Sequence, residues 1–413
     1  MRALLTRSCA VGGVAAVVAW LCFGMGLAAD PTKTGAPVPP PSAPAKGLVV
    51  HEWGTFTSFS GSDGVPAHFT PDNSDLPGFV YYQDGAEYEK GARLERDAIV
   101  SMETPVMYFY TDKEVRASIK VDFPKGWITE WYPFAVAPPS QKRKPNAPEG
   151  QSIRWDVKLL AGGTGNFARE EQKIHYYEAR ETDSVPVQAE VIVPKEQRDP
   201  AKRGGIVVQQ EKFLFYRGVG NFPPPVTVQA LGKGKVRYKN GSGARADGLV
   251  LVTVHEGKIG FKALDPLDAG AEGTATLPEA DGKPAEIAKV MVKELTAAGL
   301  YEKEAQAMVK TWDQAWFGEE GTRLLYLVPR SRTDELLRLT IDPKPTDVVR
   351  VLVGRHDFLT PEKEADVERL VKKIRTSQDE QQAADRELTK LGRFSPQARA
   401  LAEKRLDGKS VRK

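Results

Sequence analysis

The sequence predicts a mainly β protein: an antiparallel, sandwich-like domain or domains, then an α+β segment and a C-terminal helical hairpin. Three observations predict this class. Short runs of Val, Ile, Thr and aromatic residues alternate with Gly/Pro turns from residue 47 to 277. After Pro284 the apolar residues recur every three or four positions, over a segment that we place at 278–359. A charged segment with helical spacing, 360–413, ends the chain.

Residues 1–29 are typical of an export signal. A basic head precedes the apolar run from Val11 to Leu27, and small residues then offer a cleavage site before Asp30. An uncleaved membrane anchor is the alternative, because the run is near the lower limit for a membrane span. Residues 30–46, rich in Pro and Ala, are expected to form a linker. We therefore expect an exported protein (periplasmic, envelope-associated or extracellular) that contacts a membrane only if the leader is retained.

Composition narrows the functional classes. The chain has 413 residues, with 58 basic and 55 acidic side chains, and this balance argues against a nucleic-acid binder, which would carry a clustered positive surface. Both cysteines, Cys9 and Cys22, lie in the leader. The exported body must therefore be stabilised by its core, without disulfides.

The β-rich part, 47–277, is expected to hold one sandwich or two. Its first strand, 48–56, alternates so that His51 and Glu52 point to opposite faces. A helix is expected at 87–102, and long loops at 58–77 and 138–150. The other strands are expected at 104–110, 115–123, 127–134, 153–160, 173–177, 187–193, 206–216, 226–236 and 249–261, the last with a turn at 255–257.

The later elements follow from start and stop signals. Pro284 begins a helix and Gly299 ends it. A second helix is expected at 301–316 and strands at 323–328 and 347–353, whereas 333–341 is compatible with either helix or strand. Thr360, followed by Pro361, is a natural cap for the first helix of the tail.

Four blocks of this sequence resemble a family of exported bacterial proteins to which no activity is assigned. The resemblance covers about 48–360, implies export, and supplies no catalytic residue. The blocks are His51 to Thr57, Met102 to Pro105 with the run from Tyr108 to Tyr110, Phe123 to Pro133, and Leu325 to Arg330.

Four glutamates border aromatic strand segments, and they are the candidate catalytic residues: Glu52, Glu103, Glu130 and Glu211. Glycoside hydrolases use two carboxylates on either side of the scissile bond, with aromatic rings stacked on the sugar. Aromatic residues on strands also form ordinary cores, so the same pattern fits a protein without such a pair. The acids should face each other across a cleft in an enzyme, and lie singly exposed or buried against arginine otherwise.

Five further residues are candidate ligand contacts: His51, Trp53, Trp127, Trp131 and Arg217. The rings could contact a sugar or a partner protein. Arg217 follows an aromatic strand and precedes two glycines, which suits a clamp for an anion. A structural ion pair with an acid such as Glu211 is the alternative role for Arg217.

Other chemistries lack their signatures. The five histidines have no metal-ligand spacing, and the glycine-rich stretches are not followed by a phosphate-binding Lys-Ser/Thr pair. We therefore expect no metal and no cofactor. The sequence favours a binding or structural module whose partner is an envelope protein or polysaccharide, not nucleic acid, and whether it is an enzyme stays open. The alternative is a carboxylate-dependent, glycosidase-like hydrolase acting on such a polysaccharide.

Overall fold

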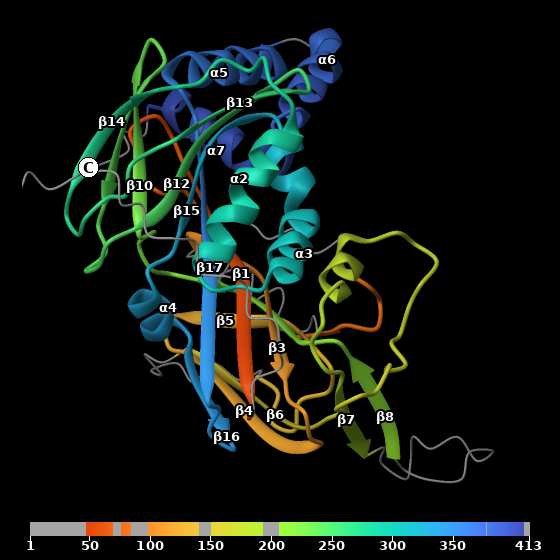
Figure 1. Cartoon of the computed structure of the whole chain (residues 1–413). Helices are drawn as coiled ribbons and strands as arrows, with labels where there is room; N and C mark the ends of the chain where they lie inside the picture. The colour runs from red at the N-terminus through yellow and green to blue at the C-terminus, as the bar shows by residue number, and fades with distance from the viewer. Residues whose placement is uncertain are drawn as a thin grey trace, which may run out of the picture. The chain divides into compact units, whose positions relative to one another are not determined.

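The computed structural model describes residues 47–68, 76–83, 98–139, 150–192, 206–376 and 378–408 (Figure 1). The expected leader and linker, 1–46, lie outside these residues. So do 87–97 of the expected helix, and 69–75 and 140–149 of the two expected loops. The chain separates into two units, Met1–Pro39 and Pro40–Lys413, and every described residue belongs to the second.

A nine-stranded sheet organises the described part of the chain, and β1 lies near its middle. β1 pairs in parallel with β17 and antiparallel with β3. Its neighbours therefore come from distant parts of the sequence. In order across the sheet the strands are Lys258–Ala263 (β13), Asp247–His255 (β12), Gly321–Leu327 (β15), Asp347–Phe358 (β17), Val49–Ser60 (β1), Val100–Tyr110 (β3), Leu214–Gly220 (β9), Gly126–Tyr132 (β5) and Tyr81–Tyr82 (β2).

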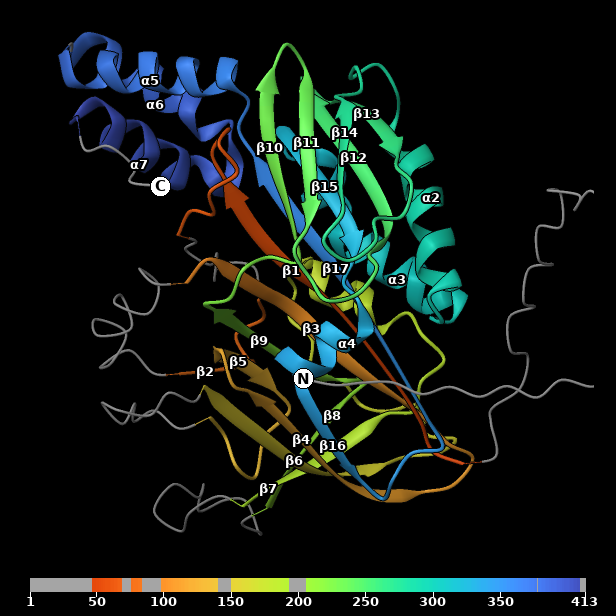
Figure 2. The ribbon, with the colours of Figure 1, turned by 90° about the vertical axis from the view of Figure 1, so that its left-hand side faces the viewer.

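Two smaller antiparallel sheets accompany it (Figure 2). The five-stranded sheet has the order Arg338–Asp342 (β16), Val115–Phe123 (β4), Gln151–Leu159 (β6), Val187–Ile192 (β7) and Ile206–Glu211 (β8). The three-stranded sheet has the order Val226–Gly232 (β10), Lys235–Asn240 (β11) and Glu272–Thr276 (β14). In β4 and β6 buried and exposed residues alternate, which is the pattern of strands with one face on a core.

The helices fall into three groups. A short helix, His175–Arg180 (η1), and the pair Pro284–Ala297 (α2) and Glu302–Asp313 (α3) lie near one another, and α3 continues into a π-helical turn, Gln314–Gly318 (η3). Arg330–Leu336 (α4) precedes β16. The tail consists of Pro361–Thr376 (α5), Gln378–Thr389 (α6), Gly392–Phe394 (η4) and Ser395–Leu406 (α7). Among the described residues, no helix has the length and apolar content needed to cross a membrane.

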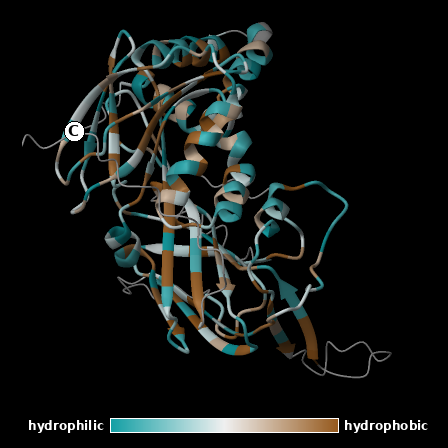
Figure 3. Ribbon diagram, viewed as in Figure 1, coloured by the Kyte–Doolittle hydropathy of each residue, from teal (hydrophilic) through white to brown (hydrophobic). Residues whose placement is uncertain are grey.

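The central sheet separates two cores. Val50 and Phe56 of β1 join the core that includes the inward residues of both smaller sheets. Val49 and Trp53 join the other core, which includes Met291 of α2 and helix α3. The hydropathy colours show apolar residues along β1 and β17, as expected for strands covered on both sides (Figure 3). The predicted alternation of 48–56 is therefore confirmed.

The predicted fold class is confirmed: the protein is mainly β, with several antiparallel sheets, an α-helical segment and C-terminal helices. The hairpin turn at 255–257 and the helix from Pro284 are present. Thr360 caps α5, because the Lys363 amide donates to the Thr360 hydroxyl at 3.2 Å. Residues 333–341 contain both expected structures, the end of α4 and then β16.

Several expected elements differ in the structure. Residues 173–177 were expected to be a strand, yet 175–180 form η1, whose Tyr176 and Ala179 are buried three residues apart. The expected strands 206–216 and 226–236 are each two strands, because turns interrupt them at 212–213 and 233–234. The end of the expected helix 87–102 is extended and enters β3 at Val100. Aromatic and β-branched composition alone does not locate such turns.

The segment 278–359 contributes β15 and β17 to the central sheet, between β12 and β1. Residues from 47–277 and from 278–359 therefore share one sheet. The tail has a small core of its own, which includes Val367, Leu388 and Phe394 and takes in Phe59 from β1.

Candidate functional site

Glu52 is buried in an ion pair. Its Oε2 accepts a hydrogen bond from Arg350 Nε at 2.5 Å, and its Oε1 accepts one from the Tyr216 hydroxyl at 2.5 Å. Arg350 stands opposite Glu52 in the parallel β1–β17 register, so the pair is built into the sheet. Arg350 also donates to Asp334 and to the Leu337 carbonyl. Glu52 is fully buried and has no access to a substrate.

Glu211 is also fully buried and paired with arginine. Arg180 Nε lies 2.8 Å from one carboxylate oxygen of Glu211, and Arg180 Nη2 lies 2.6 Å from the other. Tyr176 donates a further hydrogen bond at 3.2 Å. Burial raises the pKa of Glu211, while the charge and hydrogen bonds of Arg180 oppose that rise. This bidentate pair holds η1 against the end of β8.

Glu130 and Arg217 stand opposite each other on β5 and β9, and both are buried. The hydroxyl of Thr129 donates to the Glu130 carboxylate. The alternative partner considered for Arg217, Glu211, is instead occupied by Arg180. Buried between two neighbouring strands of the sheet, Arg217 is not placed as an open clamp.

The aromatic candidates lie mostly inside the protein. Trp53 is fully buried beside Tyr108, with ring centroids 5.8 Å apart. Trp131 is buried and stacked on Tyr81 at 6.1 Å. Trp127 is half-buried and donates from Nε1 to the Gln83 side chain at 3.1 Å. The described residues do not bring these three rings together as one recognition surface.

His51 binds an acid that the sequence did not single out. Its Nδ1 lies 2.6 Å from Oε2 of Glu304 on α3, and both side chains are buried. The other oxygen of Glu304 accepts from the Tyr110 hydroxyl at 2.8 Å, and the Tyr301 amide donates to Oε2 at 2.8 Å. This cluster fixes α3 to the central sheet on the face opposite to Glu52, as the alternation of β1 requires.

Glu103 lies beside a β-bulge in the pairing of β1 with β3. Between the pairs Trp53–Val106 and Thr55–Glu103 the register shifts, so two residues of β3 face Gly54. The fit is close: a Cβ on Gly54 would lie 2.8 Å from the Pro105 Cα. The bulge places Glu103 against Arg393 of the tail, whose Nη1 lies 2.9 and 2.8 Å from its two oxygens.

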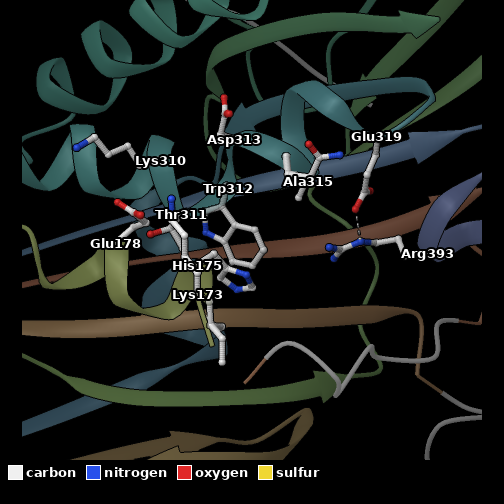
Figure 4. A pocket seen from close by; sticks show the side chains of 12 residues that line it. Lys173, His175, Glu178, Lys310, Thr311, Trp312, Asp313, Ala315, Glu319 and Arg393 are labelled. Atoms are coloured by element: carbon white, nitrogen blue, oxygen red, sulfur yellow. Dashed lines mark hydrogen bonds and ion pairs between the residues drawn. The ribbon is translucent and has the colours of Figure 1, made fainter. Parts of the chain in front are cut away.

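A cavity of about 480 Å³ lies beside this pair (Figure 4). Side chains of three segments line it. His175 and Trp312 lie close together, with ring centroids 5.8 Å apart, and Figure 4 places Glu319 and Arg393 apart from these rings. The remaining lining residues are Lys173, Ile174, Glu178, Lys310, Thr311, Asp313, Gln314 and Ala315. The wall includes the π-helical turn, a geometry that often occurs at functional sites.

A chain of alternating charges leads to the cavity, and its last two members, Glu319 and Arg393, line the wall. Arg355 Nε binds Asp357 at 2.6 Å, and its Nη2 binds Glu319 Oε2 at 2.6 Å. Arg393 Nε then binds Glu319 Oε1 at 3.1 Å. Burial would raise the pKa of Glu319, but the charges of Arg355 and Arg393 outweigh it and hold this pKa at about 2. Glu319 is therefore ionised at neutral pH.

Sequence reasoning missed Glu304, Glu319 and Arg393. Glu319 follows an irregular turn, and Arg393 lies in a tail interpreted as a solvated hairpin, so neither carried a local signal. In the described part of the chain, no cluster of three or more His, Cys, Asp and Glu side chains is arranged to hold a metal ion. The cavity instead offers donors, acceptors and charges of both signs, which suit a polar organic ligand.

Comparisons with known proteins do not identify a function for this chain. No family model matches the chain, and no curated protein matches it. One solved structure found by its similarity is the mu-homology domain of yeast delta-COP-I complexed with a Dsl1 WxWxV peptide. The two chains are 7% identical with a TM-score of 0.29, over 76% of this chain and 98% of that chain. A TM-score this low supports no argument about fold or function.

Proposed function

We propose that this chain is an exported envelope protein that binds a polysaccharide in the cavity beside Trp312. The cavity carries the proposal, because it places charged and hydrogen-bonding side chains of both signs around a half-buried imidazole, His175. Its volume, about 480 Å³, is within the usual range for small-ligand sites. The leader sequence supports export, and a segment of an envelope protein is the other ligand to be tested.

Binding is favoured over hydrolysis because of the arginines. Glu52, Glu103 and Glu211 each bind a guanidinium. A general acid works best with a pKa near the working pH, whereas Arg355 and Arg393 hold the pKa of Glu319 at about 2.

A carboxylate-dependent hydrolase remains the second candidate, for one reason: Glu103 and Glu319 both reach Arg393 at the cavity. Release of new reducing ends from a bound polysaccharide, lost on Glu103→Gln, would establish it. Binding with no such release supports the binding module.

The binding test uses the full mature chain on a glycan array and against envelope extracts. Glu178→Gln alters the cavity wall and should weaken binding several-fold. Glu279→Gln makes the same chemical change at an exposed position that does not line the cavity, so its binding should match the unaltered protein. The absence of binding to any polysaccharide, or equal effects of the two variants, contradicts the proposed site.

Export is tested separately. The mass of the intact protein recovered from the cell envelope or the medium should correspond to a chain starting near Asp30. Recovery of the full-length chain with the membranes would indicate an uncleaved anchor, and recovery only from the cytosol would contradict export.

A further inference from the structure

Two carboxylates of the body, by which we mean the described residues from 47 to 359, converge on one guanidinium of the tail. Glu103 from β3 holds Nη1 of Arg393 with both oxygens, at 2.9 and 2.8 Å. Glu319, just after the π-helical turn, holds Nε at 3.1 Å. The two acids therefore contact different nitrogens of the same planar group. An ammonium group has only one nitrogen, so it could not make both contacts in this way.

The body positions the backbone of Glu103 and holds the carboxylate of Glu319 without help from the tail. Glu103 is set by the bulge at Gly54, where the close approach of Pro105 leaves no space for a side chain. The second oxygen of Glu319 is bound by Arg355, which Asp357 holds in turn. The acids are thus preorganised, which reduces the entropic cost of binding a cation between them.

The residue that follows Arg393 anchors η4 to the body. Phe394, next to Arg393, stacks on Phe59 with centroids 5.0 Å apart and an interplanar angle of 10°. Its ring also lies over the guanidinium of Arg355 at 5.2 Å. Glu103 is buried and Arg393 is half-buried, with 6% and 15% of their side chains exposed, and partial removal from water strengthens a charged hydrogen bond.

The tail that supplies Arg393 packs largely around itself. Its core contains residues of α5, α6, η4 and α7, with Phe59 and Leu359 as the buried residues from before the tail. Two acids of α5 also accept hydrogen bonds from the body. Glu364 accepts from the amide and hydroxyl of Ser62 at 2.7 and 2.6 Å, and Glu362 accepts from the Lys233 amide at 3.0 Å.

We propose that Glu103 and Glu319 form a guanidinium-binding site of the body, which the tail fills in cis with Arg393. Docking at this site brings Arg393 into the wall of the cavity, so the tail completes one side of it. The ligand class of the site is an arginine side chain or another alkylguanidinium. This inference does not depend on what the cavity binds.

The test empties the site and refills it from solution. In the full chain, Arg393→Ala should lower the unfolding temperature, and millimolar ethylguanidinium should raise it again in a saturable way. Ethylammonium, with the same charge, should not restore it. Arg399→Ala removes a half-exposed arginine of the same tail, whose ion pairs are with Asp385 and Glu403 of the tail, and should show neither effect.

A second variant assigns the effect to the acids. Adding Glu103→Gln to Arg393→Ala should abolish the response to ethylguanidinium. If both cations restore Arg393→Ala equally, if neither does, or if the response survives Glu103→Gln, the proposed site is wrong.

Should Arg393→Ala not fold, the unaltered protein provides the measurement. Ethylguanidinium, but not ethylammonium, should compete with Arg393 and accelerate amide hydrogen exchange in η4 and α7. Equal exchange with the two salts would contradict the proposal. Neither readout requires the cavity ligand, so a negative glycan array leaves this test intact.

Discussion

His51 Nδ1 and Glu304 Oε2 lie 2.6 Å apart across 253 residues of sequence, with both side chains buried. Glu304 lies in the first turn of α3, and its contacts with His51, Tyr110 and the Tyr301 amide join β1, β3 and the start of α3 at one point. A buried acid with this many donors contributes to stability mainly because removing it leaves its partners unsatisfied.

Glu304→Gln is therefore expected to destabilise the fold. The amide keeps the shape but loses the charge that strengthens the hydrogen bonds with His51 and Tyr110, and we expect a cost of about 2–3 kcal/mol in the free energy of unfolding. Denaturant unfolding measures this. Glu302→Gln, an exposed change on the same helix, should cost less than about 0.5 kcal/mol. Equal effects of the two variants would contradict a special role for Glu304.

Removing one side of the Glu52–Arg350 pair should be more harmful than removing both. Arg350→Met leaves the fully buried Glu52 without its guanidinium, and we expect a loss of about 3–5 kcal/mol. The double variant Glu52→Gln, Arg350→Met should recover part of that loss, because no unpaired charge remains. Exposed Arg338→Met is the control. A double variant that is no more stable than Arg350→Met alone would refute this interpretation.

His356 should make stability depend on pH. It is fully buried between Ser58 and Ser60, whose hydroxyls lie 2.8 and 3.0 Å from its ring nitrogens, and burial lowers its pKa to about 4. Below about pH 6.5 the unfolded chain binds a proton at this histidine that the folded chain does not. The neutral, buried His356 therefore makes its full contribution to the free energy of unfolding above about pH 6.5. That contribution is lost as the pH falls towards 4, by up to about 3 kcal/mol.

His356→Gln should remove the part of the pH dependence between about 6.5 and 4. Urea unfolding at several pH values measures it. His68→Gln, at an exposed position, should keep the slope of the unaltered protein. An unchanged slope in His356→Gln would show that another group is responsible.

Gly54→Ala should disturb the bulge that places Glu103. The added carbon would lie 2.8 Å from the backbone of Pro105, which cannot move as a side chain can. We expect a loss of about 1–3 kcal/mol in the free energy of unfolding. Gly243→Ala meets nothing within 4 Å and should be nearly neutral. Comparable unfolding midpoints for the two variants would mean that the sheet relaxes around Gly54.

The local sequence pattern was sufficient to predict many of the strands and helices. The alternation of β1 correctly put His51 and Glu52 on opposite faces, and Pro284 and Thr360 marked the starts of helices that the structure contains. It failed at η1, where Tyr176 and Tyr177 have strand-like composition but Tyr176 and Ala179 are buried three residues apart, as in a helical turn.

The sequence by itself determined which residues are buried on which face of a strand or helix. The order of neighbouring apolar and polar residues shows the period of two of a strand, or of about 3.6 of a helix. Only the tertiary structure decided which acid meets which arginine. Glu52 pairs with Arg350 at a sequence separation of 298 residues, and Glu103 pairs with Arg393 at a separation of 290. Those pairings depend on the parallel register of β1 with β17 and on the docking of the tail, and no local period encodes either.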